Sequence, residues 1–213
     1  MRILLTFLFA TLILAACKSK TASREEEKDT PKPDSLVVVT PPANKDAVLR
    51  DLTGEVMSIL AKKDYAALAS HIHPEAGVRF SPYGHIKIDE DIIMRPEEFA
   101  KELAAQKQKT INWGEYDGTG DPIKMTLNKY LESFVYSADF SKPETFKINE
   151  VTNPGNAQNN ITTIYPKSDF TDSHFSGFEK KYEGMDWQSL RLVFSSLNGK
   201  YYLVGIIHDQ WTI

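Results

Sequence analysis

The strongest constraint in this sequence is a pair of β-rich runs that flank Asn198-Gly199 near the C-terminus. Asn-Gly is the residue pair that most readily takes positive φ at both central positions of a type I′ turn. The segment 186–213 is therefore predicted to form one long antiparallel hairpin. With a two-residue loop, Leu197 pairs with Lys200, and this pairing fixes the register of the whole hairpin.

This register predicts which side chains share a face of the hairpin. One face is expected to carry the pairs Phe194–Leu203, Leu192–Gly205 and Leu190–Ile207. The other face carries Arg191, Val193, Ser195, Tyr202, Val204 and Ile206. Because both faces are largely apolar, the hairpin is expected at the centre of a sheet that is covered on both sides. Gly205, a glycine among bulky neighbours, is expected to mark a bulge, a bend or a close approach of another group.

The N-terminal segment has the pattern of a secretion signal. The positively charged Arg2 precedes an apolar run over residues 3–16. This run is shorter than a typical transmembrane helix. Leu14-Ala15-Ala16-Cys17 resembles the lipobox of bacterial lipoproteins. The resemblance implies that residues 1–16 are a signal peptide and that Cys17 becomes the lipidated first residue, carrying acyl chains such as palmitate. The alternative is an ordinary secretory signal in which Cys17 is incidental.

The composition of the next segment predicts where the protein lies in the cell. Residues 17–43 are rich in charged residues and proline, which is typical of a flexible, solvated tether. Cys17 is the only cysteine, so no intrachain disulfide is expected. A lipid-anchored protein of the cell envelope is predicted, in the outer membrane if the cell has one, since Lys18 rather than Asp follows the cysteine.

With a net charge of −4 and no basic cluster, nucleic acid is not an expected partner.

The remaining residues, 44–213, are predicted to form a single α+β domain. Apolar residues at helical spacing predict helices over residues 44–63, 65–72, 97–105 and 127–134. Strands are expected over 78–81, 86–88 and 161–165, with loops over 113–122 and 149–160. The order of these elements favours N-terminal helices packed on one face of an antiparallel sheet that ends in the long hairpin.

Three segments carry a resemblance to known proteins. The segment 62–75, Lys-Lys-Asp-Tyr-Ala-Ala-Leu-Ala-Ser-His-Ile-His-Pro-Glu, is similar to the second-helix region of the nuclear-transport-factor-2-like (NTF2-like, or SnoaL-like) superfamily. The segments 184–194 and 206–213 resemble uncharacterised bacterial lipoproteins. The resemblance implies helices that close over a curved sheet to form a cone. It implies no activity, because that superfamily holds enzymes, binding modules and scaffolds.

Polar residues near the ends of the hairpin form the main candidate site. In the expected register Ser189 faces His208, and Arg191 lies one pair further along the His208 face. His208, Arg191 and Asp186 are weak candidates for an acid–base site at the mouth of a pocket. The candidate ligand-binding residues are Arg191, His208, Trp187, Trp211 and Tyr202. Alternatively, these residues form a structural cluster in which a carboxylate neutralises Arg191 and the tryptophans cover the end of the sheet.

Two further groups contain residue types that bind metals. His71, His73 and Glu75 would converge on a metal ion only if the chain there is extended, and the alternative is a histidine bonded to a helix end. Asp117 and Asp121 flank a glycine-rich turn but lack the spacing of a calcium loop. Phe80, Tyr83, Trp113 and Tyr116 are aromatic residues that either line a pocket or belong to the core. No metal and no cofactor are expected.

These observations predict a non-enzymatic module that binds a small molecule or another envelope protein. One alternative is a small pocket enzyme, a lyase, isomerase or hydrolase, that uses His208 with Asp186 or Arg191. Another is a purely architectural lipoprotein. No Ser-His-Asp elbow, P-loop, dinucleotide fingerprint or zinc motif is present to favour an enzyme.

The lipobox gives a direct prediction. Cys17→Ser removes the thiol that would carry the lipid, so this variant should leave the membrane fraction, whereas the wild-type chain stays in it. Immunoblotting of separated soluble and membrane fractions measures the change. If the variant remained with the membrane, the attachment would have to be of another kind.

Overall fold

The computed structural model describes residues 44–155 and 158–212. The predicted signal peptide, Cys17 and the predicted tether lie outside these residues. None of the helices in this part of the chain is long and apolar enough to cross a membrane.

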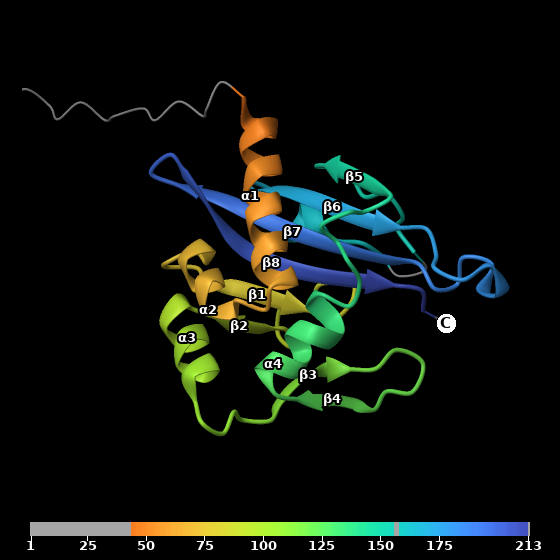
Figure 1. The fold of residues 1–213 in the computed structure, drawn as a ribbon, viewed down its shortest axis with the longest axis horizontal. Helices are drawn as coiled ribbons and strands as arrows, with labels where there is room; N and C mark the ends of the chain where they lie inside the picture. The colour runs from red at the N-terminus through yellow and green to blue at the C-terminus, as the bar shows by residue number, and fades with distance from the viewer. Residues whose placement is uncertain (1–43, 156–157, 213) are drawn as a thin grey trace, which may run out of the picture. The chain divides into compact units, whose positions relative to one another are not determined.

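A six-stranded sheet with the order β2-β1-β8-β7-β6-β5 forms the centre of the domain (Figure 1). Its strands are β1 (Val78–Ser81), β2 (Ile92–Met94), β5 (Thr145–Ile148), β6 (Asp169–Phe175), β7 (Gln188–Leu197) and β8 (Lys200–Gln210). Neighbouring strands are antiparallel except β1 and β8, which run parallel. The α+β class is confirmed, but the expectation of an entirely antiparallel sheet was wrong. No hairpin turn joins β1 to β8, so local chain geometry does not set their relative direction.

The helices and a small second sheet complete the domain. The helical elements are α1 (Lys45–Ala61), α2 (Tyr65–Leu68), η1 (Ala69–His71), α3 (Pro96–Ala104), α4 (Leu127–Tyr130), the π-helical η2 (Leu131–Val135), α5 (Ile161–Ile164) and η3 (Lys180–Tyr182). The second sheet pairs β3 (Ile111–Glu115) with β4 (Pro122–Met125). Asn44 caps α1, where its side chain accepts a hydrogen bond from the Ala47 N–H at 3.2 Å.

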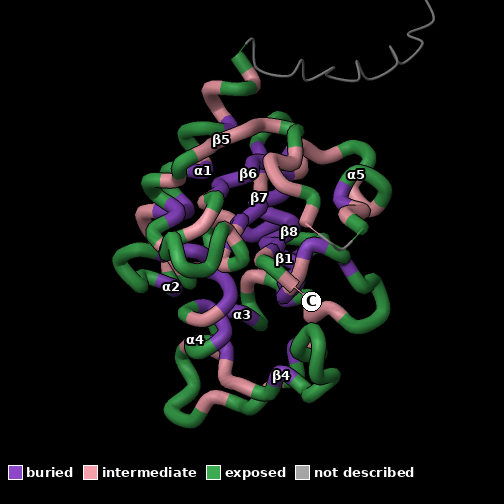
Figure 2. The backbone as a smooth tube through the Cα atoms, turned by 90° about the vertical axis from the view of Figure 1, so that its right-hand side faces the viewer, coloured by how far each residue is buried: buried purple, intermediate pink, exposed green. Residues whose placement is uncertain are grey.

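Both faces of the central hairpin are buried, as the sequence predicts. Figure 2 shows the central strands buried along most of their length. On one face a large core joins α1 to the sheet through Leu49, Val56, Met57, Leu60, Leu190, Leu192, Phe194, Leu203 and Ile206. On the other face a smaller core contains Ile86, Ile161, Phe170, Val193, Val204 and Ile207.

The hairpin register follows the prediction only near the turn. Leu197 pairs with Lys200 and Phe194 with Leu203, as expected, but the register then shifts between Val193 and Phe194. Val193 pairs with Gly205, so β8 has one additional residue there, a β-bulge. A Cβ on Gly205 would lie 3.0 Å from Val193 Cγ2 and 3.2 Å from Tyr165 Oη, so the expected bulge and close approach are both present.

Beyond the bulge, every predicted pair is displaced by one residue. Leu192 pairs with Ile206 rather than Gly205, and Leu190 pairs with His208 rather than Ile207. Ser189 pairs with Asp209, not with His208. Because side chains alternate along a strand, this one-residue shift exchanges the faces on which His208 and Asp209 lie.

Some predicted elements are corrected and others confirmed. Residues 86–88 are not a strand, and Ile161–Ile164 form the helix α5 rather than a strand. Trp113 lies in β3 and not in a loop. Strands β5 and β6 were not predicted at all, because Asp169–Phe175 alternates polar and apolar residues only weakly. The strand over residues 78–81 and the helices that begin near residues 45, 65, 96 and 127 are confirmed.

Candidate functional site

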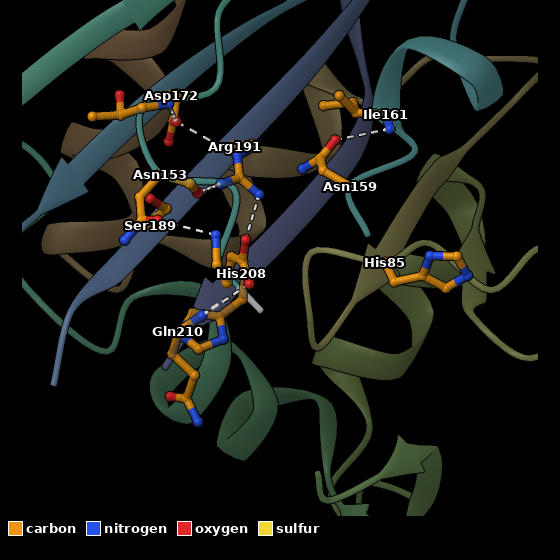
Figure 3. A network of polar contacts seen from close by, with 12 residues as sticks. His85, Asn153, Asn159, Ile161, Asp172, Ser189, Arg191, His208 and Gln210 are labelled. Atoms are coloured by element: carbon orange, nitrogen blue, oxygen red, sulfur yellow. Dashed lines mark hydrogen bonds and ion pairs between the residues drawn. The ribbon is translucent and has the colours of Figure 1, made fainter. Parts of the chain in front are cut away.

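Arg191 is fully buried and is held by two carboxylates on the sheet face that carries Val193 (Figure 3). Its Nη1 donates to Asp209 Oδ2 at 2.8 Å, and its Nε lies 3.5 Å from Asp172 Oδ2. Its Nη2 donates to the Asn153 carbonyl at 3.0 Å. The requirement for an anionic partner, expected from the sequence, is met from two neighbouring strands.

The same cluster fixes two loops against the sheet. The Thr152 N–H donates to Asp172 Oδ2 at 2.7 Å. A Cβ on Gly84 would lie 2.4 Å from Asp209 Oδ2, so only glycine lets the loop approach this carboxylate. Burial raises the pKa of Asp209, while the Arg191 charge and the Gly84 backbone oppose that rise. We refer to Asp172, Arg191 and Asp209 as the Arg191 cluster, and its position and contacts are those of a structural clamp.

His208 lies on the opposite face of the sheet from Arg191, so the prediction that the two share a face was wrong. The extra residue at the bulge is the physical reason. His208 Nδ1 is 3.0 Å from the Pro82 carbonyl, to which it donates as the Nδ1–H tautomer, and the ring packs edge-on against Phe134. The side chain is 1% exposed, and burial lowers its pKa from 6.5 to about 4. A neutral, enclosed imidazole is a poor candidate for a proton carrier that must reach a substrate.

The other predicted site residues do not join His208 and Arg191 in one pocket. Asp186 Oδ2 accepts a hydrogen bond from the Glu179 N–H at 2.8 Å, within the β6–β7 loop. Trp187 is buried beside His174, with ring centroids 5.9 Å apart. Trp211 is 38% exposed, and Tyr202 packs against His73 with ring centroids 5.7 Å apart.

The candidate metal ligands do not converge on a common point in the described part of the chain. His73 lies beyond the end of η1, and its Nδ1 accepts from the Glu75 and Ala76 N–H groups at 3.2 Å and 3.0 Å, so it caps the following turn rather than bonding to helix-end carbonyls. Residues 117–121 form the tip of the β3–β4 hairpin, where Thr119 Oγ1 accepts from the Asp121 N–H. Among residues 44–155 and 158–212, no group of three or more potential ligands could hold a metal ion.

A pocket of about 480 Å³ lies between the β3–β4 tip and residues 82–91. Tyr83 and Tyr116 line it, whereas Phe80 and Trp113 belong to the core. Its most enclosed carboxylate, Asp91, already accepts hydrogen bonds from Ser81 and from the Lys87 N–H. The walls are mostly exposed loop residues, so this pocket is a weaker candidate than a second hollow beside α1.

The second hollow, of about 430 Å³, runs along α1 on the other face of the sheet. We call it the α1 groove. Its lining residues are Arg50, Thr53, Gly54, Met57, Ser58, Ala61 and Lys62 from α1, Phe140, Ser141, Pro143 and Phe146 from the segment opposite, and Ser173 from β6. Its volume falls within the usual range of small-molecule sites, about 300–1,000 Å³.

The sequence places the α1 residues of the groove on one stripe of the helix. Arg50, Gly54, Met57 and Ala61 recur at steps of three and four. Thr53 connects this stripe to the sheet, because its hydroxyl lies 3.0 Å from Thr171 Oγ1 on β6. Within α1 the same hydroxyl donates to the Leu49 carbonyl at 2.7 Å. The register of β5 and β6 places Phe146 opposite Ser173 on the groove face.

The groove residues were not among the candidates predicted from the sequence. Ser173 lies on β6, a strand that the sequence pattern did not predict. Gly54 was visible as a glycine inside a helix, a position where glycine costs about 0.5–1 kcal/mol relative to alanine. That cost was the one signal in the sequence that pointed to this face of α1.

Comparison of the chain with protein-family models, with curated proteins and with solved structures found no significant match. Function is therefore inferred from the sequence and from the described residues.

Removing the central cation of the Arg191 cluster should strongly destabilise the domain. Arg191→Met leaves Asp172 and Asp209 buried without their charge partner, and we expect the free energy of unfolding to fall by about 3–5 kcal/mol. Denaturant unfolding followed by circular dichroism measures the loss. As a control, adding Asp172→Asn and Asp209→Asn removes the unpaired charges and should restore much of the stability. A triple variant as unstable as the single variant would show that charge burial is not the cause.

The buried His208 predicts a specific pH dependence. Its pKa is about 4 in the folded chain, against the ordinary value of 6.5 that it regains on unfolding, so between these values the unfolded chain binds a proton that the folded chain excludes. The free energy of unfolding should therefore fall as the pH is lowered from 6.5 to 4, by about 3 kcal/mol from this group.

His208→Asn supplies the matched comparison, because its amide can still donate to the Pro82 carbonyl but does not titrate. Its stability should depend less steeply on pH over this window than that of the wild type. Burial also lowers the pKa of His71 and His174. Both proteins keep these two histidines, so their effect on the pH dependence of stability is the same in each and cancels in the comparison. Equal slopes for the two proteins would contradict the prediction.

Proposed function

We propose that this chain is a lipid-anchored protein of the cell envelope whose domain is a non-enzymatic binding module, with the α1 groove as its ligand site. The lipobox-like Leu14-Ala15-Ala16-Cys17 and the polar segment 17–43 support the anchored part of this proposal. The groove supports the binding part, because it combines an apolar floor with a few polar groups, as small-molecule sites generally do.

The observation that carries the proposal is Gly54. This residue sits in the interior of α1, lines the groove, and a Cβ added to it would meet nothing within 4 Å. Packing therefore does not demand glycine here, and alanine would suit the helix better by about 0.5–1 kcal/mol. Glycine at position 54 lowers the stability of the helix but keeps the groove open. Such a residue is expected at a place where a ligand enters.

The enzyme alternative receives no support from the site geometry. His208 and Arg191 lie on opposite faces of the sheet, both are buried, and Asp186 is engaged in a loop. A purely architectural role leaves the unfilled groove beside Gly54 without an explanation.

The NTF2-like cone remains part of the proposal as the finer description of the fold. An N-terminal helix lies across one face of a sheet whose longest strands, β7 and β8, are the last in the chain, and this arrangement supports it (Figure 1). An experimental structure superimposed on NTF2-like domains would test it, and a flat sheet without a cone would contradict it.

Blocking the groove should abolish ligand binding without unfolding the domain. In the full chain, held in a neutral detergent, we expect Gly54→Trp to weaken binding of the uncharged apolar probe N-phenyl-1-naphthylamine at least about tenfold. The reporter is the ¹³C-methyl NMR signal of Met57, which lines the groove and does not sense probe dissolved in detergent.

Glu55→Trp is the matched control, because Glu55 is the exposed neighbour of Gly54 on α1 and does not line the groove. It should leave the titration of the Met57 signal unchanged. If Gly54→Trp titrated like the wild type, or if the wild-type Met57 signal never responded, the groove would not be the ligand site.

A further inference from the structure

Two of the polar residues that line the α1 groove, Arg50 and Ser173, lie close together near one of its ends. Arg50 and Lys62 both line it, but they are twelve residues apart on α1, which is about 18 Å along a helix. The Arg50 guanidinium carbon lies 4.8 Å from the centre of the Phe146 ring. Phe146 in turn pairs with Ser173 across β5 and β6. The cation and the Ser173 side chain therefore flank the same aromatic ring.

Ser173 is a buried polar group that lines the groove without a partner. It is 1% exposed, and its hydroxyl makes no hydrogen bond with any residue the structure describes. A buried hydroxyl without a partner costs about 1–3 kcal/mol, so such groups generally serve a further purpose. Here the hydroxyl lies at the floor of a groove, beside the aromatic ring that Arg50 covers.

Arg50 is exposed to solvent and keeps its charge available, because no described residue forms an ion pair with it. Neither Arg50 nor Lys62 forms an ion pair with a described residue, and no acidic residue is among those that line the groove. An arginine stacked on an aromatic ring keeps the N–H groups at its edge free to bind a carboxylate or phosphate. Arg50 and Ser173 thus offer an anion a charged donor and a neutral donor.

The rest of the groove is mostly apolar, with Ser58 and Ser141 among its neutral polar residues. Beyond Gly54, the surfaces that face each other are Met57 and Ala61 on α1 and Phe140 and Pro143 opposite. Lys62 ends this stretch, and its aliphatic stem can cover an apolar ligand while its ammonium stays in water. A ligand that fits both parts has an anionic group at one end and a hydrocarbon body.

We propose that the α1 groove binds a single-chain amphiphile of the fatty-acid class, with one anionic head group. This inference rests on the proposed function. The head group lies between Arg50 and Ser173, and the hydrocarbon chain extends along Gly54 and Met57 toward Ala61. Arg50 and Ser173 are then the residues that select an anionic ligand over a neutral one.

The test compares decanoate with decanol, which has the same chain length and no charge. Both are titrated at pH 8 into the full chain in neutral detergent, with the Met57 methyl signal as the readout. Decanoate should bind about tenfold more tightly than decanol to the wild type, since a charge-assisted contact adds roughly that factor. Decyl phosphate should share this advantage, because its head group offers the same chemistry.

Three variants locate the head group. Arg50→Met should remove most of the advantage of decanoate over decanol, and Ser173→Ala should reduce that advantage by a smaller factor. Lys62→Met removes the same charge at the other end of the groove and should leave the ratio of decanoate to decanol affinity nearly unchanged. Ser173→Ala should not lower the melting temperature, because the hydroxyl it removes has no described partner, so lost affinity would not reflect unfolding.

The outcomes separate this inference from the proposed function. If decanol bound as tightly as decanoate, or if Lys62→Met cost as much affinity as Arg50→Met, the anionic head group or its position would be wrong while the groove would still bind ligand. If neither decanoate nor decanol moved the Met57 signal, and Gly54→Trp had no effect on the apolar probe, the groove itself would be ruled out as the ligand site.

Discussion

The burial of the Arg191 charge is the constraint on which one whole side of this domain depends. A guanidinium with no exposure to water must be neutralised inside the protein, and Asp172 and Asp209 do this from the strands on either side of β7. The carboxylates also bind backbone groups of the loops around Gly84 and Thr152. Charge compensation therefore acts together with the apolar packing of Ile86 and Val151 to hold these two loops against the sheet.

A single bulge determines which carboxylate meets Arg191. Without the extra residue beside Gly205, Asp209 would point to the core of α1 and His208 would face Arg191. With it, Asp209 completes the cluster, and His208 turns into the large core, where burial keeps it neutral. The bulge thus separates the acid–base residues that the sequence placed together, and it converts a candidate active site into two structural contacts.

The two faces of the sheet differ in how completely their polar groups are satisfied. On the Arg191 face the charges are paired, although Arg191 Nε and Asp172 Oδ1 make no hydrogen bond with a described residue. On the α1 face, Arg50 and Ser173 have no described ionic or hydrogen-bonding partner, and Gly54 leaves space above them. The Arg191 face thus combines a small apolar core with buried ion pairs, whereas the α1 face combines the large apolar core with the groove.

Local sequence signals determined the elements whose geometry depends only on neighbouring residues. Asn198-Gly199 determined the turn, helical spacing and capping determined α1 to α4, and the two apolar faces predicted a central hairpin. Only the tertiary structure decided the parallel pairing of β1 with β8, the bulge, the Asp172 partner and the α1 groove. Each of these depends on contacts between segments far apart in the chain, where packing and charge compensation override local preference.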